Sequence, residues 1–324
     1  MIRFIARRLL LLMPLMLGIT FVSWAAIQLV PGTSDYFQAL VVQYPQITPE
    51  RVAALRAQFG MDKPPLVQYV HWLWSILHLN FGYSFAYNVP VTFLIGSRAL
   101  NTLLLSLTSL VAAWSIALPL GIYSAVHQYS VLDGALSALA FIAISVPSFF
   151  SALLLLYCAF WTHALPLQGL ESANFDFLSP WGRVLDIAQH LVLPTIALGV
   201  FSVGGLMRYM RTNLLDVLRS DYMRTARAKG LAERRVIFRH AFRNAINPLV
   251  TLFGFELGGL LSGAAFVENV LGYPGLGRLV LQAVLQKDVF LVMGSLLMGS
   301  VLLILGNLVA DVLLAAVDPR IRYE

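Results

Sequence analysis

Six stretches of the chain are long, apolar and almost free of charge. They span residues 9–30, 99–132, 134–170, 191–207, 244–267 and 289–310, and Glu256 is the one carboxylate, lysine or arginine within them. A helix of roughly 20 apolar residues crosses the hydrocarbon core of a bilayer, which is about 30 Å thick. The fourth stretch needs flanking residues to reach that length. The pattern therefore predicts an all-α integral membrane protein with six transmembrane helices.

The composition agrees with a membrane environment. Hydrophobic residues make up 59% of the chain and charged residues 12%, whereas soluble proteins carry roughly a quarter charged residues. The lone cysteine, Cys158, can form no disulfide within the chain and no thiol-based metal site. The first apolar stretch is longer than the apolar core of a signal peptide, so we expect it to be a retained span.

Basic residues are unevenly divided between the two sides of the predicted bundle. If both ends of the chain lie in the cytoplasm, the internal segments hold 15 of the 22 lysines and arginines and the external segments hold seven. Lysine and arginine favour cytoplasmic segments. We therefore interpret the formal net charge of +6 as a topology signal rather than a nucleic-acid-binding surface, and expect both termini inside.

These patterns divide the chain into four parts. Residues 1–8 form a cytoplasmic N-terminus, 9–30 the first span, 31–98 an external segment, and 99–324 a transmembrane domain that includes a cytoplasmic segment, 208–243. Val52, Leu55 and Phe59 follow helical spacing in the external segment, and many aromatic residues come after them. Tryptophan and tyrosine favour the headgroup level, which predicts short helices on the outer membrane surface.

The cytoplasmic segment is predicted to form a helical hairpin. Apolar or small side chains at Leu215, Leu218, Tyr222 and Ala226 fall on one face of a helix over residues 214–229. Gly230 ends this helix, because glycine adopts the left-handed conformation at low cost. A second helix with a basic face follows over residues 231–244. Such a basic loop can also serve only to orient the protein or to bind anionic lipid headgroups.

The hairpin carries a run of residues with a close resemblance to a known family. The runs DYMRTARAKGL (Asp221–Leu231) and RHAFRNAINP (Arg239–Pro248) resemble the coupling motif of ATP-binding-cassette importer permeases of the dipeptide, oligopeptide and nickel type, first-subunit form. Further landmarks of that family occur in order: VPG at Val30, FGMD at Phe59, PLVQY at Pro65, GYS at Gly82, SVPSF at Ser145, HLVLP at His190, ENV at Glu268, YPGLG at Tyr273 and DPRIRY at Asp318. The chain departs from the family pattern at Leu79, Asn80, Asn269 and Leu271.

The resemblance implies a transport subunit that hydrolyses no ATP itself. It implies partners: a second related permease, two cytoplasmic ATPase subunits that bind ATP and magnesium, and an external solute-binding protein, all at a bacterial inner membrane. It implies no cofactor or metal in this subunit. The helix ending near Gly230 would dock on an ATPase subunit, and the residues implied in this coupling are Asp221, Tyr222, Thr225, Ala226, Arg227, Ala228, Gly230 and Leu231.

The fifth apolar stretch supplies the candidates for a translocation path. An ionisable residue deep in a span usually faces the bundle interior or a wet path, which makes Glu256 a candidate; a purely structural carboxyl bonded to a neighbouring helix is the alternative. Two Gly-x-x-x-Gly spacings, ending at Gly258 and Gly263, allow close helix approach. By the resemblance this span borders the path, which adds Gly259, Gly263 and Glu268 to the candidates.

Other functions find less support in the residues. The chain holds no phosphate-binding loop and no His-Glu-x-x-His zinc motif, and His163 and His190 lie in no recognisable nucleophile setting. A secondary transporter or channel would work without ATPases and would typically show internal repeats, and none is visible. Peptides are the expected solutes, with nickel chelates and glutathione-like compounds as alternatives that share the same motifs.

Overall fold

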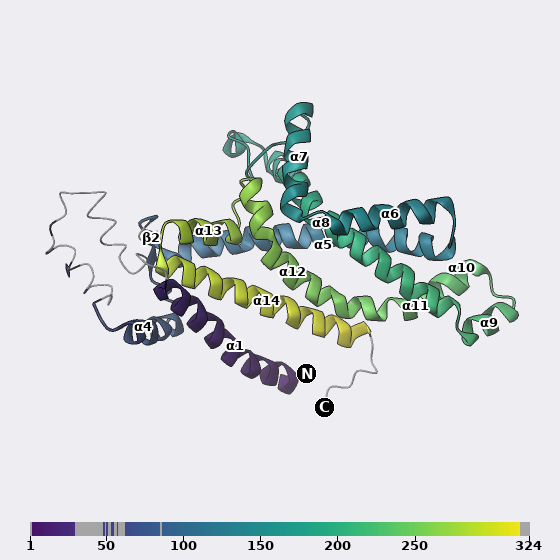
Figure 1. Cartoon of the computed structure of the whole chain (residues 1–324), viewed down its shortest axis with the longest axis horizontal. Coiled ribbons are helices and arrows are strands. Elements are labelled where there is room, and N and C mark those ends of the chain that lie inside the picture. The colour runs from purple at the N-terminus through teal and green to yellow at the C-terminus, as the bar shows by residue number, and fades with distance from the viewer. Residues whose placement is uncertain are drawn as a thin grey trace. The chain divides into compact units, whose positions relative to one another are not determined.

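The computed structural model describes residues 2–29, 48, 50, 53–54, 57, 62–84 and 86–317 (Figure 1). Most of these residues are helical. The helix predicted from Val52, Leu55 and Phe59 lies outside the described residues, as does the DPRIRY motif after residue 317.

The elements of the first part of the chain are α1 (Ile2–Leu29), α4 (Pro65–Leu77), β1 (Tyr83–Ser84), β2 (Val89–Pro90), α5 (Val91–Val126), α6 (Val131–Ser145) and α7 (Ser148–Thr162). The elements of the second part are η1 (Phe175–Phe177), α8 (Pro180–Leu218), α9 (Asp221–Ala228), α10 (Glu233–Arg235), η2 (Val236–Ala241), α11 (Phe242–Ala245), α12 (Asn247–Val270), α13 (Leu276–Leu285) and α14 (Val289–Val317). The short strands β1 and β2 pair antiparallel, with Tyr83 opposite Pro90 and Ser84 opposite Val89.

Three helices in the described part of the chain are long and apolar enough to cross a membrane. They are α5, α8 and the Val289–Val309 part of α14. A fourth crossing results if α6 and α7 count as one broken span. The helices α1 and α12 cover the first and fifth apolar stretches, with 28 and 24 residues. The prediction of an all-α membrane protein is therefore confirmed at the level of helical content and apolar spans.

The third apolar stretch, residues 134–170, is not one continuous helix. It forms two 15-residue helices, α6 and α7, bent by 104° at the break between them. Pro147 stands at the break, and Val146 before it is extended, with φ −92° and ψ 119°. Proline lacks the amide hydrogen that would continue the helix and disfavours helical geometry in the residue before it, which explains the bend.

Helix α8 extends well beyond the apolar core from which residues 191–207 predicted it. Its 39 residues span about 58 Å at 1.5 Å per residue, far more than a hydrocarbon core of about 30 Å. Charged residues occupy both extensions, among them Asp186 near the start and Arg211 near the end. The helix therefore carries its polar ends past the membrane core, where they contact loops.

By its internal contacts the chain divides into two compact units. The first unit comprises Met1–Asn101 and Gly275–Val301. Its core is an aromatic and aliphatic cluster of Trp24, Tyr69, Trp72, Val289, Met293 and Leu297. The hydroxyls of Thr20 in α1 and Tyr69 in α4 lie 3.0 Å apart, within hydrogen-bonding distance, and this bond ties α4 to α1.

The opposite face of α4 is apolar and exposed. Leu66, Val70, Trp74 and Leu77 repeat at helical spacing on it, and each is more than 60% exposed. A helix that is apolar on its outer face fits the membrane surface, as the sequence predicts for the external segment.

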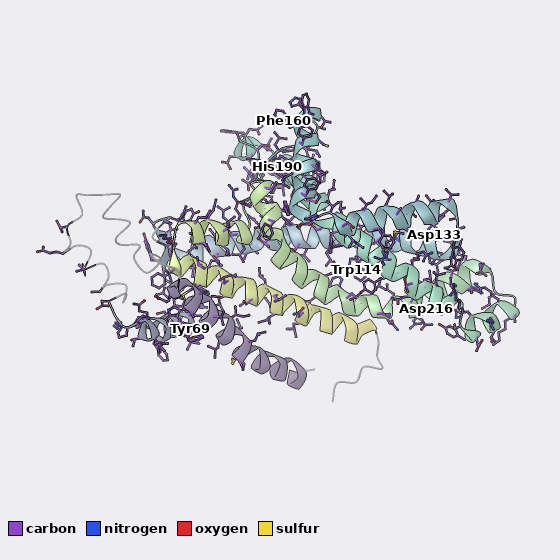
Figure 2. All side chains as sticks on the ribbon, in the orientation of Figure 1. Tyr69, Trp114, Asp133, Phe160, His190 and Asp216 are labelled. Carbon is purple, nitrogen blue, oxygen red and sulfur yellow. The ribbon has the colours of Figure 1, made fainter. Side chains whose placement is uncertain are left out.

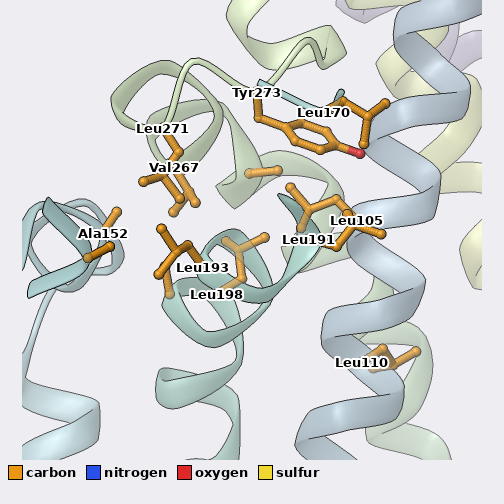
Figure 3. Close-up of a cluster of buried hydrophobic side chains, with 13 residues drawn as sticks. Leu105, Leu110, Ala152, Leu170, Leu191, Leu193, Leu198, Val267, Leu271 and Tyr273 are labelled. Atoms are coloured by element: carbon orange, nitrogen blue, oxygen red, sulfur yellow. The ribbon is translucent and has the colours of Figure 1, made fainter. Parts of the chain in front are cut away.

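The second unit comprises Thr102–Pro274 and Leu302–Glu324, and α8 is its central helix. Helices α6, α7 and α12 all pack on α8. Figure 3 shows a hydrophobic cluster of this unit, in which Tyr273 and Leu170 from two loops cover Leu105 of α5 and Leu191 of α8. The α6–α8 contact is close: a Cβ on Gly204 would lie 2.7 Å from the Ala140 carbonyl oxygen. Only glycine fits there without a shift of the backbone.

Candidate functional site

The segment between α8 and α12 folds into a compact hairpin at the end of α8 (Figure 1). The single helix predicted for residues 214–229 is wrong in its bounds: α8 ends at Leu218, and the eight-residue helix α9 begins at Asp221. Ser220 is extended, with φ −70° and ψ 154°, in the conformation of a residue that precedes a helix. Asp221 in the first turn of α9 and Arg227 in its last turn complement the helix dipole.

Helix α9 rests on the second unit through one buried side chain. Met223 is fully buried against Met210, Leu214 and Val236. Of the predicted coupling residues in α9, Asp221, Tyr222, Thr225, Arg227 and Ala228 are exposed, and Ala226 is half-buried. A single apolar anchor thus fixes the helix while most of its surface faces away from the fold.

The turn after α9 has the geometry that the sequence predicts. Gly230 adopts a left-handed conformation, with φ +74°. A Cβ placed on it would meet no atom within 4 Å, so the outer side of the turn is open. Leu231 is half-buried and packs on the cluster around Met223. At Ala228 and Gly230 the backbone of the turn is therefore accessible, because their side chains are small or absent.

An ion pair holds the turn closed. Nη2 of Arg227 donates to Oε1 of Glu233 at 2.8 Å, and its Nε lies 3.2 Å from Oε2. The hydrogen bonds from Arg227 hold the pKa of the Glu233 carboxyl below its ordinary value. The pair is about half exposed, so it orders the turn more than it stabilises the fold.

The second arm of the hairpin is irregular. It runs through α10, the π-helix η2 and α11 into α12, instead of forming the regular helix predicted for residues 231–244. Val236, Ile237, Ala241 and Ala245 are buried along its inner side. The basic side chains of this arm are exposed, namely Arg234, Arg235, Arg239 and Arg243. A basic face on the second arm is therefore confirmed, although the helix that carries it is broken.

A buried ion pair lies at the base of the hairpin, where α8 meets the turn between α5 and α6. Nε and Nη2 of Arg211 donate to the two carboxylate oxygens of Asp133, at 2.8 and 2.9 Å. Asp133 also accepts hydrogen bonds from the Ser124 hydroxyl and from the amide of Tyr129, the latter at 2.9 Å. The side chain of Asp133 is 4% exposed. Figure 2 labels its position. This network joins α5, α6 and α8 next to the hairpin.

Sequence reasoning did not identify this network. Its signal is the isolated aspartate that separates two charge-free stretches, residues 99–132 and 134–170. Asp133 and Arg211 are 78 positions apart, so nothing local in the sequence pairs them.

The path candidates lie at different places on α12. Glu256 is half-buried, and its Oε2 accepts a hydrogen bond of 2.8 Å from the hydroxyl of Ser202 in α8. Its carboxyl lines a cavity of about 680 Å³ at the bend between α6 and α7. Glu268 lies twelve residues further along, fully buried, and accepts a hydrogen bond of 2.6 Å from Thr102 of α5. Gly259 and Gly263 lie in α12 between them, and their surroundings are outside the described residues.

A second carboxylate network lies at the other end of α8. Asp186 accepts hydrogen bonds from the amide of Ser172, at 2.9 Å, and from the Ser172 hydroxyl. The backbone oxygen of Asp186 lies 2.8 Å from Nδ1 of His190. The Ser172 hydroxyl bonds to the aspartate and not to the histidine, so the three residues hold a loop on α8 instead of activating a nucleophile. Within the described residues, no group of three histidine, cysteine or acidic side chains could hold a metal ion.

Comparison with known proteins covers the chain from end to end. The family described as binding-protein-dependent transport system inner membrane component matches residues 117–323, and its N-terminal companion matches residues 1–107. The chain belongs to this family. It is the permease subunit of an ATP-binding-cassette importer, as the motifs around Gly230 indicated.

The relatives of this permease include transporters of several small solutes. It is 37% identical over 325 residues to the oligopeptide transport system permease protein AppB of Bacillus subtilis, with both chains fully covered. It is 35% identical over 341 residues to the dipeptide transport system permease protein DppB of Escherichia coli K12, again over both whole chains. It is 36% identical over 324 residues to the glutathione transport system permease protein GsiC of Salmonella typhi, with both chains fully covered.

Family membership gives the two candidate regions a context. A permease of a binding-protein-dependent system is an inner membrane component, which agrees with the apolar helices. Both the hairpin and the cavity beside Glu256 fall within the matched residues 117–323. The hairpin is the part of this region that extends from the apolar spans and exposes its surface.

Proposed function

We propose that this permease imports di- or oligopeptides, and that α9 couples its spans to ATP hydrolysis by a partner. The observation that carries the proposal is the exposed surface of α9 and the Gly230 turn on a rigid base at the end of α8. Whole-length similarity to an oligopeptide and a dipeptide permease supports the choice of solute.

The proposed coupling is mechanical. An ATPase groove that receives α9 can approach the backbone at Ala228 and Gly230, because the side chain of the first is a methyl group and the second has none. Met223 and the Asp133–Arg211 pair connect α9 and the end of α8 to α5 and α6. A displacement of α9 would therefore move these helices as a body, in the manner of rigid-body switching.

The proposed topology has six crossings, formed by α1, α5, the α6–α7 pair, α8, α12 and α14, with both termini in the cytoplasm. The Asp133–Arg211 pair supports it, because the α5–α6 turn and the end of α8 must then lie on one side. The exposed basic residues of the hairpin support a cytoplasmic side.

The proposed complex contains a second related permease, two ATPase subunits that supply ATP and magnesium chemistry, an external solute-binding protein and the surrounding lipid. In this assignment the present subunit binds no cofactor, carries no catalytic residue and binds no nucleic acid.

The test is uptake by the reconstituted complex in liposomes, with the binding protein and ATP. Dipeptides and tripeptides, glutathione and a nickel chelate are each supplied as labelled solutes. We expect ATP-dependent uptake of the peptides. Glutathione is the second candidate, because the relative from Salmonella typhi is a glutathione permease. An assembled complex that takes up the nickel chelate alone would contradict the peptide assignment, and failure to assemble with an ATPase would contradict the coupling assignment.

A further inference from the structure

The cavity beside Glu256 is lined by four helices, α6, α7, α8 and α12, at the α6–α7 bend. Its volume is about 680 Å³, within the range of about 300–1,000 Å³ typical of small-molecule sites. Ser148 and Phe149 line it from the start of α7, Ser202 and Tyr209 from α8, and Glu256 and Phe266 from α12. All of these residues belong to the second unit.

The carboxyl of Glu256 has free capacity toward this cavity. A carboxylate offers about four acceptor positions on two oxygens, and Ser202 occupies one of them on Oε2. Among the side chains that the structure describes, no cationic group pairs with Glu256. An acidic group at this depth in a span is costly, and such groups typically mark a path for a ligand. The group that satisfies it best is a cation with several N–H donors.

The remaining lining suits the parts that all peptides share. Hydroxyl groups of Ser148 and Tyr209 can bond to backbone amides. The rings of Phe149 and Phe266, 44% and 67% exposed, offer apolar surface without selecting one side chain. Only the terminal ammonium, the backbone and the terminal carboxylate are common to peptides of every sequence, so a path that accepts many peptides must recognise these groups.

We propose that this cavity is a peptide site in which Glu256, held by Ser202, binds the N-terminal ammonium group. The proposal rests on the proposed function and names the part of the peptide that the path recognises. An inorganic cation is the competing occupant.

The test reads the cavity directly, without the binding protein. The variant Ser148→Cys is made in a Cys158→Ala background, and the rate at which a small methanethiosulfonate reagent modifies the cysteine is measured in the assembled complex. We expect trialanine to slow the modification about tenfold and N-acetyl-trialanine to leave it unchanged, since a charged hydrogen bond is worth about an order of magnitude in affinity.

Substitution at Glu256 provides the second arm. We expect Glu256→Gln to remove the protection by trialanine and Glu256→Asp to retain part of it, while the matched Glu171→Gln, an exposed carboxyl in the loop after α7, keeps it in full. Equal protection by the acetylated peptide, equal protection by Ni²⁺ alone, or full protection in an assembled Glu256→Gln complex would overturn the proposal. If the Glu256→Gln complex does not assemble, the comparison of trialanine with N-acetyl-trialanine tests the proposal by itself.

This assay also separates the site from the transport assignment. Failure of the proposed function appears as absence of peptide uptake by the unsubstituted complex. If the site assignment alone is wrong, peptide uptake still occurs, but trialanine and N-acetyl-trialanine slow the cysteine modification equally.

Discussion

At the residue scale, two buried aspartates organise the parts of the chain that leave the apolar spans. Asp133 binds Arg211 beside the hairpin. Asp288, fully buried at the start of α14, accepts hydrogen bonds from the Ser84 hydroxyl at 2.7 Å and from the amides of Ala86 and Leu291, both at 3.1 Å. In each case one carboxylate gathers donors from segments that are distant in the sequence, and so fixes a loop on a helix end.

Removal of the Asp133 carboxylate should destabilise the permease. Asp133→Ala leaves the guanidinium of Arg211, 24% exposed, without its acid, and we expect a loss of about 2–3 kcal/mol, below the about 3–5 kcal/mol of a fully buried pair. The measurement is the thermal unfolding midpoint of the purified complex. The double variant Asp133→Leu with Arg211→Met should recover most of the loss, because apolar residues can replace a buried pair.

The exposed pair between Asp221 and Arg224 provides the control for stability. Its side chains are 97% and 76% exposed, so Asp221→Ala should change the unfolding free energy by less than about 1 kcal/mol. Equal shifts of the midpoint in Asp133→Ala and Asp221→Ala would contradict the structural role given to Asp133.

Removal of the Asp288 carboxylate should loosen the β1–β2 hairpin. Asp288→Ala leaves the amides of Ala86 and Leu291 without their acceptor, and an unsatisfied buried donor costs about 1–3 kcal/mol. We expect hydrogen exchange over residues 83–91 to rise about tenfold or more. Asp62→Ala, which removes an exposed carboxylate, should leave that exchange unchanged. Unaltered exchange in Asp288→Ala would refute the anchoring role.

At the element scale, α9 is held in place by few buried contacts and leaves most of its surface exposed. Apart from Met223 and the half-buried Ala226, its side chains are exposed. Sequence periodicity predicted this helix and its end at Gly230. It also predicted that the helix continues without a break through residues 219–220, where the structure separates α8 from α9. The amphipathic spacing continues across that break, and Ser220 followed by Asp221, a common helix start, is the local signal that marks it.

Substitutions on α9 should separate coupling from folding. We expect Ala226→Glu and Ala228→Glu to reduce peptide uptake to below about a tenth, because each places a charge that must be desolvated in the proposed interface. Membrane insertion and complex purification should be unaffected. Thr212→Glu, at an exposed position on α8, is the control and should transport normally. Normal uptake by Ala228→Glu would show that this face of α9 is not buried by a partner.

Two substitutions at Gly230 separate the effect of backbone strain from the effect of side-chain volume. Any residue other than glycine in its left-handed conformation costs about 1–2 kcal/mol, and Gly230→Ala adds that strain with little volume. We expect Gly230→Trp to abolish uptake and Gly230→Ala to reduce it only in part. Equal loss in the two variants would assign the effect to the turn itself and not to a docked partner.

At the scale of the whole molecule, the helical content and the apolar character of the spans could be predicted from the sequence, and the ends of the helices could not. The absence of charge locates the apolar cores of α5, α8 and α14. The ends of helices that extend past the membrane carry charges whose partners are distant in the sequence, as Asp133 is from Arg211. Pro147 marks the break between α6 and α7 in the sequence, but the bend angle of 104° depends on how α7 packs against α8 and α12. The cavity beside Glu256 was beyond prediction for the same reason, since Ser202 reaches Glu256 only through the packing of α8 on α12.

The most direct measurement of the coupling assignment is cross-linking of α9 to an ATPase subunit in the transporting complex. Ala228→Cys is introduced in the Cys158→Ala background and treated with a short thiol-to-amine cross-linker, and Thr212→Cys serves as the control. The account predicts a product that joins the permease to the ATPase from position 228 and none from position 212. An active complex in which position 228 forms no product with the ATPase would contradict it.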